Sequence, residues 1–206
     1  MSKIKHLNII TLGSSKVGKT SILKRYIDNE YHEEQLSTFG IEHNFRYFKF
    51  NEEKVKIDYV DTAGQEAFRS IASNYLKKAD GVILTFDITQ RDSFELVGNW
   101  LDDLEKNNNK NNIGIILIGN KNDLEEQRQV KKEEGENMAN NIKCEYMEVS
   151  AKTGDNINEA LDEIAKITYE NYKSNPLEES NSFNLDKYRR KSIFKEKKKK
   201  SKSKCC

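Results

Sequence analysis

Residues 13–20 read G-S-S-K-V-G-K-T and match the pattern G-x-x-x-x-G-K-[ST]. The two glycines let the backbone curl so that several N–H groups face one point, where a helix expected to begin near Lys19 adds its positive end. The Lys19 ammonium group can reach phosphate oxygens, and the Thr20 hydroxyl can bind Mg²⁺. Because the segment follows a predicted strand and opens a predicted helix, it predicts a phosphate-binding loop. The residues expected to hold phosphates are Gly13, Ser14, Ser15, Lys16, Val17, Gly18, Lys19 and Thr20.

A second group, D-T-A-G-Q at residues 61–65, lies where another predicted strand ends. The Asp61 carboxylate suits Mg²⁺, directly or through water, and the Gly64 N–H can approach a terminal phosphate. Gln65 offers both a donor and an acceptor, which suits the orientation of a water molecule for in-line attack. Together with the phosphate loop, this group predicts phosphoryl transfer to water with Gln65 as the catalytic residue.

Two further groups follow later predicted strands, N-K-N-D at residues 120–123 and S-A-K at residues 150–152. A carboxylate at Asp123 can accept hydrogen bonds from the N1–H and N2–H₂ groups of guanine. Adenine lacks both donors and would leave a buried carboxylate unpaired. A backbone N–H in the S-A-K group can reach the guanine O6 atom. The residues expected around the base are Asn120, Lys121, Asp123, Ser150, Ala151 and Lys152.

These groups need a scaffold that brings the ends of several strands together. Apolar strand patterns alternate with amphipathic helix patterns, which predicts an α/β fold with helices on both faces of a mostly parallel sheet. Predicted strands cover residues 6–12, 45–50, 55–60, 81–88, 113–118 and 145–149. Predicted helices cover residues 20–29, 67–78, 93–106, 131–140 and 156–172. We therefore expect a three-layer fold like that of P-loop NTPases, with a six-stranded sheet and one antiparallel hairpin strand. Ligands in such folds bind beyond the carboxyl ends of the strands, where all four groups fall.

Composition divides the chain of 206 residues into two unlike parts. Residues 187–204 carry eleven basic residues and one acid, whereas residues 1–186 have a net charge of −9. We expect a folded domain at residues 1–174 and a basic tail at residues 175–206. No apolar run approaches the ~18 residues of a membrane helix, and no signal peptide is evident at the start, so we expect a cytosolic protein. The asparagine-rich segment 107–112 is predicted to be a solvated loop.

The three cysteines are too few for a disulfide scaffold. Cys144 lies in an apolar-leaning run and is predicted to be a small, half-buried strand residue.

The set of four groups resembles the small GTPases of the Ras superfamily over residues of about 6–172. Within that superfamily the chain resembles the Rab branch, through S-T-F-G-I-E at residues 37–42, F-D-I-T at residues 86–89 and R-Q-V at residues 128–130. The resemblance implies a switch of vesicle and protein traffic that binds GTP or GDP with Mg²⁺ and hydrolyses GTP.

The resemblance also assigns residues that the spacing of motifs does not. It places Thr38 with Thr20 and Asp61 on Mg²⁺, and it places the Tyr31 ring near the guanine. Lys16 stands where the family usually has glycine or a small residue. Rab proteins usually present phenylalanine, tryptophan and tyrosine to their effectors, and the matching positions here are His43, Val60 and Tyr75. We expect an intact nucleotide site beside a diverged recognition surface.

No arginine is clearly placed to stabilise the transition state, so intrinsic hydrolysis is expected to be slow, on the order of 10⁻⁴ to 10⁻³ s⁻¹. The resemblance implies a monomer served by an exchange factor, a GTPase-activating protein, a GDP-dissociation-inhibitor-type escort and effectors.

The chain ends in Cys205-Cys206 after a lysine-rich run, and Ser203 stands where a C-a-a-X motif needs cysteine. The resemblance implies geranylgeranyl groups on both cysteines, and two lipid chains anchor stably where one does not. We expect the protein on the cytosolic face of an intracellular or plasma membrane, with a soluble escorted pool.

Two alternatives stay open at this point. Lys16 and the altered recognition surface also fit a GTP-bound scaffold that does not hydrolyse its nucleotide. The basic tail also fits nucleic-acid binding. We expect a GTP-hydrolysing switch first. We expect no nucleic-acid partner, because residues 1–174 show no basic face rich in aromatic residues.

Overall fold

The computed structural model describes residues 4–33, 38, 40–62, 74–108 and 112–174. Its strands are β1 (Lys5–Leu12), β2 (Ile41–Phe50), β3 (Glu53–Thr62), β4 (Gly81–Asp87), β5 (Gly114–Asn120) and β6 (Glu145–Val149). Its helices are α1 (Lys19–Asp28), α3 (Arg91–Glu95), α4 (Val97–Asn107), the 3₁₀ helix η2 (Asn122–Gln127), α5 (Lys132–Ile142) and α6 (Ile157–Ser174).

The strands form one six-stranded sheet in the order β2-β3-β1-β4-β5-β6. All neighbouring pairs are parallel except β2 and β3, which form an antiparallel hairpin with Ile41 opposite Thr62 and Phe50 opposite Glu53. Every residue of β4 and β5 is buried, as expected for central parallel strands covered on both faces. The predicted α/β fold is confirmed, including its antiparallel strand.

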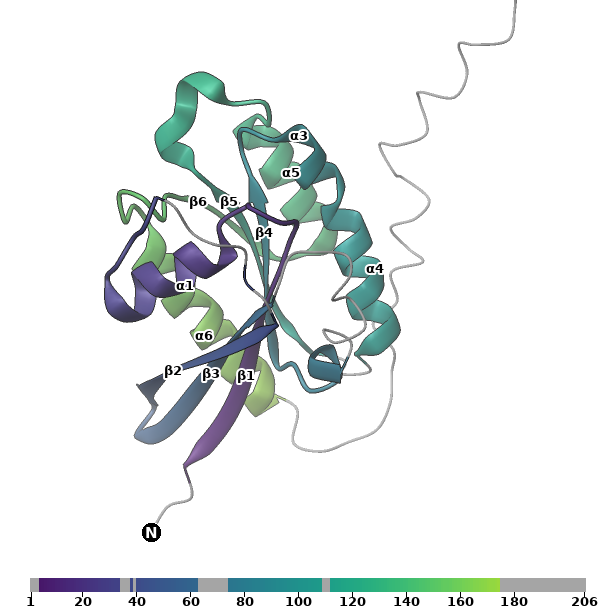
Figure 1. Ribbon diagram of the computed structural model, residues 1–206. Coiled ribbons are helices and arrows are strands. Elements are labelled where there is room, and N and C mark those ends of the chain that lie inside the picture. The colour runs from purple at the N-terminus through teal and green to yellow at the C-terminus, as the bar shows by residue number, and fades with distance from the viewer. Residues whose placement is uncertain (1–3, 34–37, 39, 63–73, 109–111, 175–206) are drawn as a thin grey trace, which may run out of the picture.

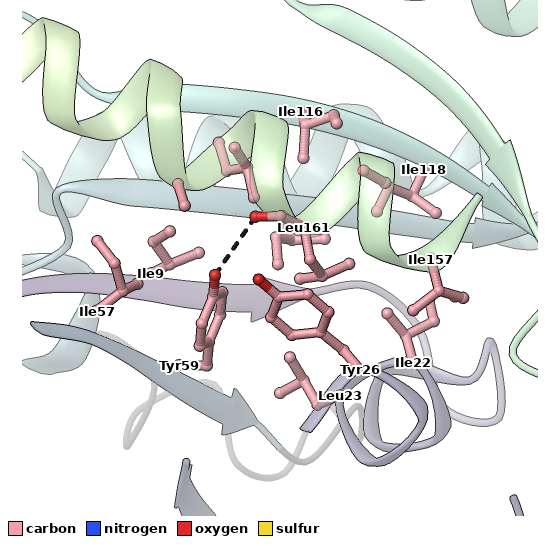
Figure 2. Packing of buried hydrophobic residues seen from close by; sticks show 14 of the residues in the cluster. Ile9, Ile22, Leu23, Tyr26, Ile57, Tyr59, Ile116, Ile118, Ile157 and Leu161 are labelled. Atoms are coloured by element: carbon pink, nitrogen blue, oxygen red, sulfur yellow. Dashed lines mark hydrogen bonds between the residues drawn. The ribbon is translucent and has the colours of Figure 1, made fainter. Parts of the chain in front are cut away.

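Two hydrophobic cores fill the space between the sheet and its helices. Figure 1 shows α1 and α6 on one side of the sheet and α3, α4 and α5 on the other. On the first side Tyr26 and Tyr59 meet edge to face with ring centroids 5.5 Å apart, and the Tyr59 hydroxyl donates to the Leu161 carbonyl at 3.3 Å (Figure 2). On the second side the rings of Phe86 and Phe94 pack 4.9 Å apart. The sheet is thus anchored by layers on both faces.

The structure differs from the predicted elements at several boundaries. The helix predicted at residues 93–106 is two helices, because α3 ends at Glu95 and α4 begins at Val97. Most of the helix predicted at residues 67–78 falls outside the described residues. Cys144 is half-buried, as predicted, and immediately precedes β6; burial raises the pKa of its thiol to about 12.

The prediction of a solvated loop at residues 107–112 is wrong at Asn108. Its side chain is buried, and its amide nitrogen donates to the carbonyls of Leu76 at 2.6 Å and Ala79 at 3.1 Å. A side-chain amide supplies two donors, which here bind the Ala79 carbonyl and give the Leu76 carbonyl a second donor beside the Ala79 N–H. Asn108 therefore ties the end of α4 to the segment that leads into β4.

A search of the described helices for a stretch long and apolar enough to cross a membrane finds none.

Substitution Asn108→Ala is expected to lower the free energy of unfolding by about 2 kcal/mol, because the buried carbonyls of Leu76 and Ala79 each lose the donor that Asn108 provides. Urea denaturation followed by circular dichroism measures this change. The matched control Asn112→Ala alters an exposed side chain and is expected to change stability by less than ~0.5 kcal/mol. Equal effects of the two substitutions would contradict the assigned role.

Candidate nucleotide-binding site

A cavity of about 440 Å³ lies at the carboxyl ends of the parallel strands, within the size range of small-molecule sites. Most predicted site residues line it: Ser15, Lys16, Gly18, Lys19, Thr20, Tyr31, Thr38, Asn120, Lys121, Asp123, Ala151 and Lys152. The cavity walls also include residues that the sequence did not single out: Ser21, His32, Glu33, Thr62 and Leu124. Sequence segments more than a hundred residues apart are therefore brought to one place.

Other predicted site residues lie outside the cavity lining. Gly13, Val17, Asp61 and Ser150 are buried behind it, and Ser14 is half-buried. Gly64 and Gln65 fall outside the described residues, as do Cys205 and Cys206.

Both glycines of residues 13–20 lie so close to a neighbouring group that a side chain at either position would clash with it. Gly13 has φ 148°, and a Cβ there would lie 2.2 Å from the Thr85 carbonyl oxygen. Gly18 has φ 96°, and a Cβ there would lie 2.2 Å from Nδ2 of Asn120. Gly18 also caps the N-terminus of α1 without a side-chain hydrogen bond, so the positive end of that helix opens toward the cavity. The loop thus presents backbone donors to an anion.

Lys19 is a buried cation at the base of this loop, with 5% of its surface exposed. Its ammonium group donates to the carbonyls of Gly13 and Ser14, both at 2.8 Å. Burial lowers the pKa of Lys19 to about 8, and the negative charge of Asp61 only partly opposes this shift. A cation in this position is stabilised by an anion beside it, and a phosphate group fits that need.

Asp61 is buried behind the cavity lining, and its carboxylate accepts hydrogen bonds from two threonine hydroxyls. One carboxylate oxygen accepts from the Thr11 hydroxyl at 3.0 Å, and the other accepts from the Thr20 hydroxyl at 2.5 Å. The Thr20 and Thr38 hydroxyl oxygens are 2.6 Å apart. Burial is the main cause of a raised pKa at Asp61. Carboxylate and hydroxyl oxygens are suitable ligands for Mg²⁺, so this cluster fits the ion, whose charge would favour the ionised carboxylate.

Asn120 connects the phosphate loop to the S-A-K group through its side chain. Its Nδ2 donates to the Val17 carbonyl at 2.8 Å, and its Oδ1 accepts from the Ala151 N–H at 3.2 Å. The residue is 1% exposed. These contacts make Asn120 a positioning residue that holds two loops at a set separation.

The carboxylate of Asp123 is held by the S-A-K group. The Ser150 hydroxyl donates to Oδ1 of Asp123 at 2.6 Å and accepts from the N–H groups of Lys152 and Thr153. The buried Ser150 therefore orients the carboxylate that the sequence predicts for base recognition.

Lys121 makes an ion pair across the site that sequence reasoning missed. Its ammonium group lies 2.6 Å from Oδ2 of Asp87, which is fully buried at the end of β4. The other oxygen of Asp87 accepts from the N–H and the hydroxyl of Thr89. Asp87 belongs to the F-D-I-T run, which supports the resemblance to the Rab branch but does not indicate a contact with Lys121.

Arg25 is a second residue that the sequence did not indicate. From α1 it donates to the carbonyls of Ala151 at 3.0 Å and Lys152 at 2.9 Å. Its guanidinium carbon lies 6.0 Å from the centroid of the Tyr31 ring. Arg25 thus links the S-A-K group to the segment that carries Tyr31.

Lys16 has φ 63°, a backbone conformation that favours glycine, and its side chain is exposed at the cavity. A lysine fits at this position because its side chain extends into solvent, although its positive φ is less favourable for lysine than for glycine.

The three positions of the Rab recognition surface differ in accessibility. The rings of His43 and Tyr75 lie 5.6 Å apart and remain at least partly exposed, whereas Val60 is buried at 1%.

Comparison with known proteins identifies a matching family model and a large set of curated relatives. The family model described as Ras family matches residues 8–170. The chain is also 40% identical over 159 residues to the Ras-related protein Rab-1 of Theileria parva, an alignment that covers 77% of this chain and 72% of the relative.

The buried ammonium group makes the stability of the nucleotide-free protein depend on pH. The unfolded state holds the Lys19 proton up to a pKa of 10.5, whereas the folded state loses it near 8, so stability rises with pH in this window. From pH 7.5 to 10.5 the wild-type protein is expected to gain about 3 kcal/mol relative to Lys19→Met.

Urea denaturation at each pH measures this difference. The control Lys132→Met removes an exposed ammonium group and is expected to show no such trend. A difference between wild type and Lys19→Met that stays constant with pH would refute the role of burial.

Proposed function

The chain belongs to the Rab branch of the Ras superfamily of small GTPases, and from this premise we propose how its own residues carry out the family's activity. The protein is a Rab-type switch of vesicle traffic that binds and hydrolyses GTP. Hydrolysis must stabilise negative charge on phosphate oxygens and hold a water molecule in line. The observation that carries the proposal is the cluster of Thr20, Thr38 and Asp61 beside the Lys19 ammonium group.

The phosphate groups of GTP or GDP are proposed to bind over residues 13–20. Backbone N–H groups and the N-terminus of α1 supply donors and a positive potential, and Lys19 supplies a full charge. The buried Ser14 hydroxyl has no hydrogen-bond partner among the described residues, which fits a polar ligand beside the loop.

Members of this family bind Mg²⁺ with the nucleotide. We assign its protein ligands to Thr20, Thr38 and, directly or through water, Asp61. When bound, the ion neutralises charge that develops on the phosphate oxygens. Asp61 then holds the Thr20 hydroxyl in place, and Thr11 holds Asp61.

The guanine base is proposed to bind between Asp123, Lys121 and the Tyr31 ring. Asp123 accepts from the base edge, and the N–H groups near Ala151 and Lys152 provide donors for O6. Discrimination against adenine follows because the Asp123 carboxylate would lose its donors. Asn120 keeps this half of the site in register with the phosphate loop.

Gln65 is proposed to orient the attacking water, and the Gly64 N–H to contact the terminal phosphate. Thr38 is proposed to report the nucleotide state. Its hydroxyl contacts Thr20 at 2.6 Å, so a γ-phosphate and Mg²⁺ would hold the segment around it, and hydrolysis would release that segment.

The family generally binds guanine nucleotide, exchange factors, activating proteins, GDP-dissociation inhibitors and effectors, and its members associate with the cytosolic face of membranes. For this chain we propose a monomeric GTPase domain at residues 1–174, whose tail at residues 175–206 carries geranylgeranyl groups on Cys205 and Cys206. Family membership supports hydrolysis over a non-hydrolysing scaffold, and it gives no support to nucleic-acid binding through the basic tail.

Single-turnover hydrolysis of bound GTP with Mg²⁺ tests the assignment of Gln65. The wild-type rate is expected to be on the order of 10⁻⁴ to 10⁻³ s⁻¹ and to fall about tenfold or more in Gln65→Leu, because the water loses its orienting group. Gln90→Leu changes an exposed glutamine elsewhere and is expected to leave the rate unchanged. Tight GTP binding without turnover in the wild type would support the scaffold instead.

Fractionation of cells tests the lipid anchor. The double variant Cys205→Ser, Cys206→Ser is expected to move from the membrane pellet to the soluble fraction, because it loses both sites of lipidation. Cys144→Ser changes the half-buried thiol and is expected to keep the wild-type distribution. Membrane association that persists in the double variant would disprove the anchor.

A further inference from the structure

The outward face of the β2–β3 hairpin carries two exposed aromatic rings. Side chains of β2 alternate between its two faces, and Phe48 and Phe50 pack toward the core, where Phe50 stacks on Tyr169 of α6 with centroids 4.7 Å apart. Phe45 and Tyr47 point the other way and are 52% and 51% exposed. Among the described residues, the only other large hydrophobic side chain that is exposed is Ile4. Figure 1 shows this hairpin at one end of the sheet.

Two lysines of β3 lie over these rings. The Lys56 ammonium nitrogen is 4.5 Å from the centroid of Phe45, and the Lys54 ammonium nitrogen is 4.5 Å from that of Tyr47. The two rings meet edge to face at 5.7 Å. We call these four residues the aromatic–lysine face. Lys56 also forms an ion pair with Asp58 at 2.5 Å, whereas Lys54 has no ion pair among the described residues. Because rings and a cation are interleaved, the face suits a ligand that offers apolar and anionic groups together.

The last turn of α6 lies against the same hairpin. The Lys173 ammonium group is 2.5 Å from Oε1 of Glu53, and the Tyr169 hydroxyl donates to Oε2 of Glu53 at 3.1 Å. Since α6 ends at Ser174, the chain leaves the helix beside the β2–β3 turn. Whatever follows Ser174 in the sequence therefore starts beside the hairpin, on the side opposite to the aromatic–lysine face.

The sequence that follows has the chemistry that this face requires. Residues 177–186 read L-E-E-S-N-S-F-N-L-D and combine three acids with two leucines and a phenylalanine, whereas residues 187–204 are strongly basic. Phe183 lies nine steps along the chain from Ser174, which span up to ~30 Å when extended. The five steps along β2 from Phe50 to Phe45 measure ~17 Å. The segment is long enough to pass around the hairpin and reach the face.

We propose that residues 177–186 bind to the aromatic–lysine face of their own chain. The acids pair with Lys54, since Lys56 is already paired with Asp58, and the apolar side chains cover Phe45 and Tyr47. A short tether gives an effective concentration in the mM range, so a weak contact is sufficient. The bound segment occupies the outward face of the hairpin, and a partner that uses this face must displace it. This inference does not depend on the assignment of the GTP site.

Photo-cross-linking in the full chain tests the contact. The substitution Tyr47→p-benzoylphenylalanine keeps an aromatic ring on the face, and mass spectrometry of the digested product locates the linked residues. Links are expected within residues 177–186. The matched control places the same group at Glu126, an exposed position on η2, and is expected to give no link to that segment. An absence of links from position 47 to residues 177–186 would overturn the proposal.

Charge and ring variants separate this contact from chance proximity. Glu178→Lys with Glu179→Lys is expected to lower the yield of links about tenfold, and adding Lys54→Glu is expected to restore it. Phe183→Ala is expected to lower the yield, whereas Phe194→Ala in the basic part is expected to leave it unchanged. A yield that changes neither in Glu178→Lys with Glu179→Lys nor in Phe183→Ala would overturn the proposal.

An equal mixture of ¹⁵N-labelled and unlabelled chains shows whether the contact lies within one chain. Linked peptides are expected to be wholly labelled or wholly unlabelled. Peptide pairs of mixed label would overturn the proposal and would indicate contact between two chains. The experiment contains no lipid. If the face binds an anionic membrane instead of residues 177–186, no links to that segment form, and this result would also overturn the proposal.

Discussion

The side chain of Asn120 is the contact on which the rest of the site depends. It donates to the Val17 carbonyl in the phosphate loop and accepts from the Ala151 N–H in the S-A-K group. The approach is so close that a Cβ on Gly18 would meet Nδ2 at 2.2 Å. One buried amide therefore sets the separation between residues 13–20 and the S-A-K group, the proposed phosphate and base sides of the site. A short side chain at the end of a central parallel strand can do this because β5 is covered on both faces and cannot shift.

Buried charges make the site ready for an ionic ligand. Lys19 and Asp61 are both nearly inaccessible, and burial disfavours the charged form of each, as the direction of each pKa shift shows. Burial of an ion without close partners is costly, and here carbonyls, hydroxyls and the opposite charge reduce that cost only partly. Anionic phosphates and a divalent cation would complete the compensation. The fold thus fixes the positions of Lys19 and Asp61 before a ligand binds. Their positions determine where the charges of the ligand must lie.

The β2–β3 hairpin has two faces with different tasks. Its inner face joins the core through Phe48 and Phe50, whereas its outer face presents Phe45 and Tyr47 with their lysines. Near the nucleotide site the same hairpin buries Val60, so the recognition surface there relies on His43 and Tyr75. Near the nucleotide site the hairpin surface differs from the usual Rab pattern, and further along β2 it carries the aromatic–lysine face. Both features are consistent with partners particular to this protein.

The sequence by itself determined the phosphate loop, the order of strands and helices and the location of the motifs at strand ends, because these depend on local spacing and on hydrophobic periodicity. It also indicated the residue types around the base and the metal. The tertiary structure decided which side chains pair: Asn120 with Val17 and Ala151, Lys121 with Asp87, and Arg25 with the S-A-K group. It also decided that Asn108 is buried and that Val60 is inaccessible. These outcomes join residues from separate elements, and no local pattern records which distant carbonyl or carboxylate a donor will meet.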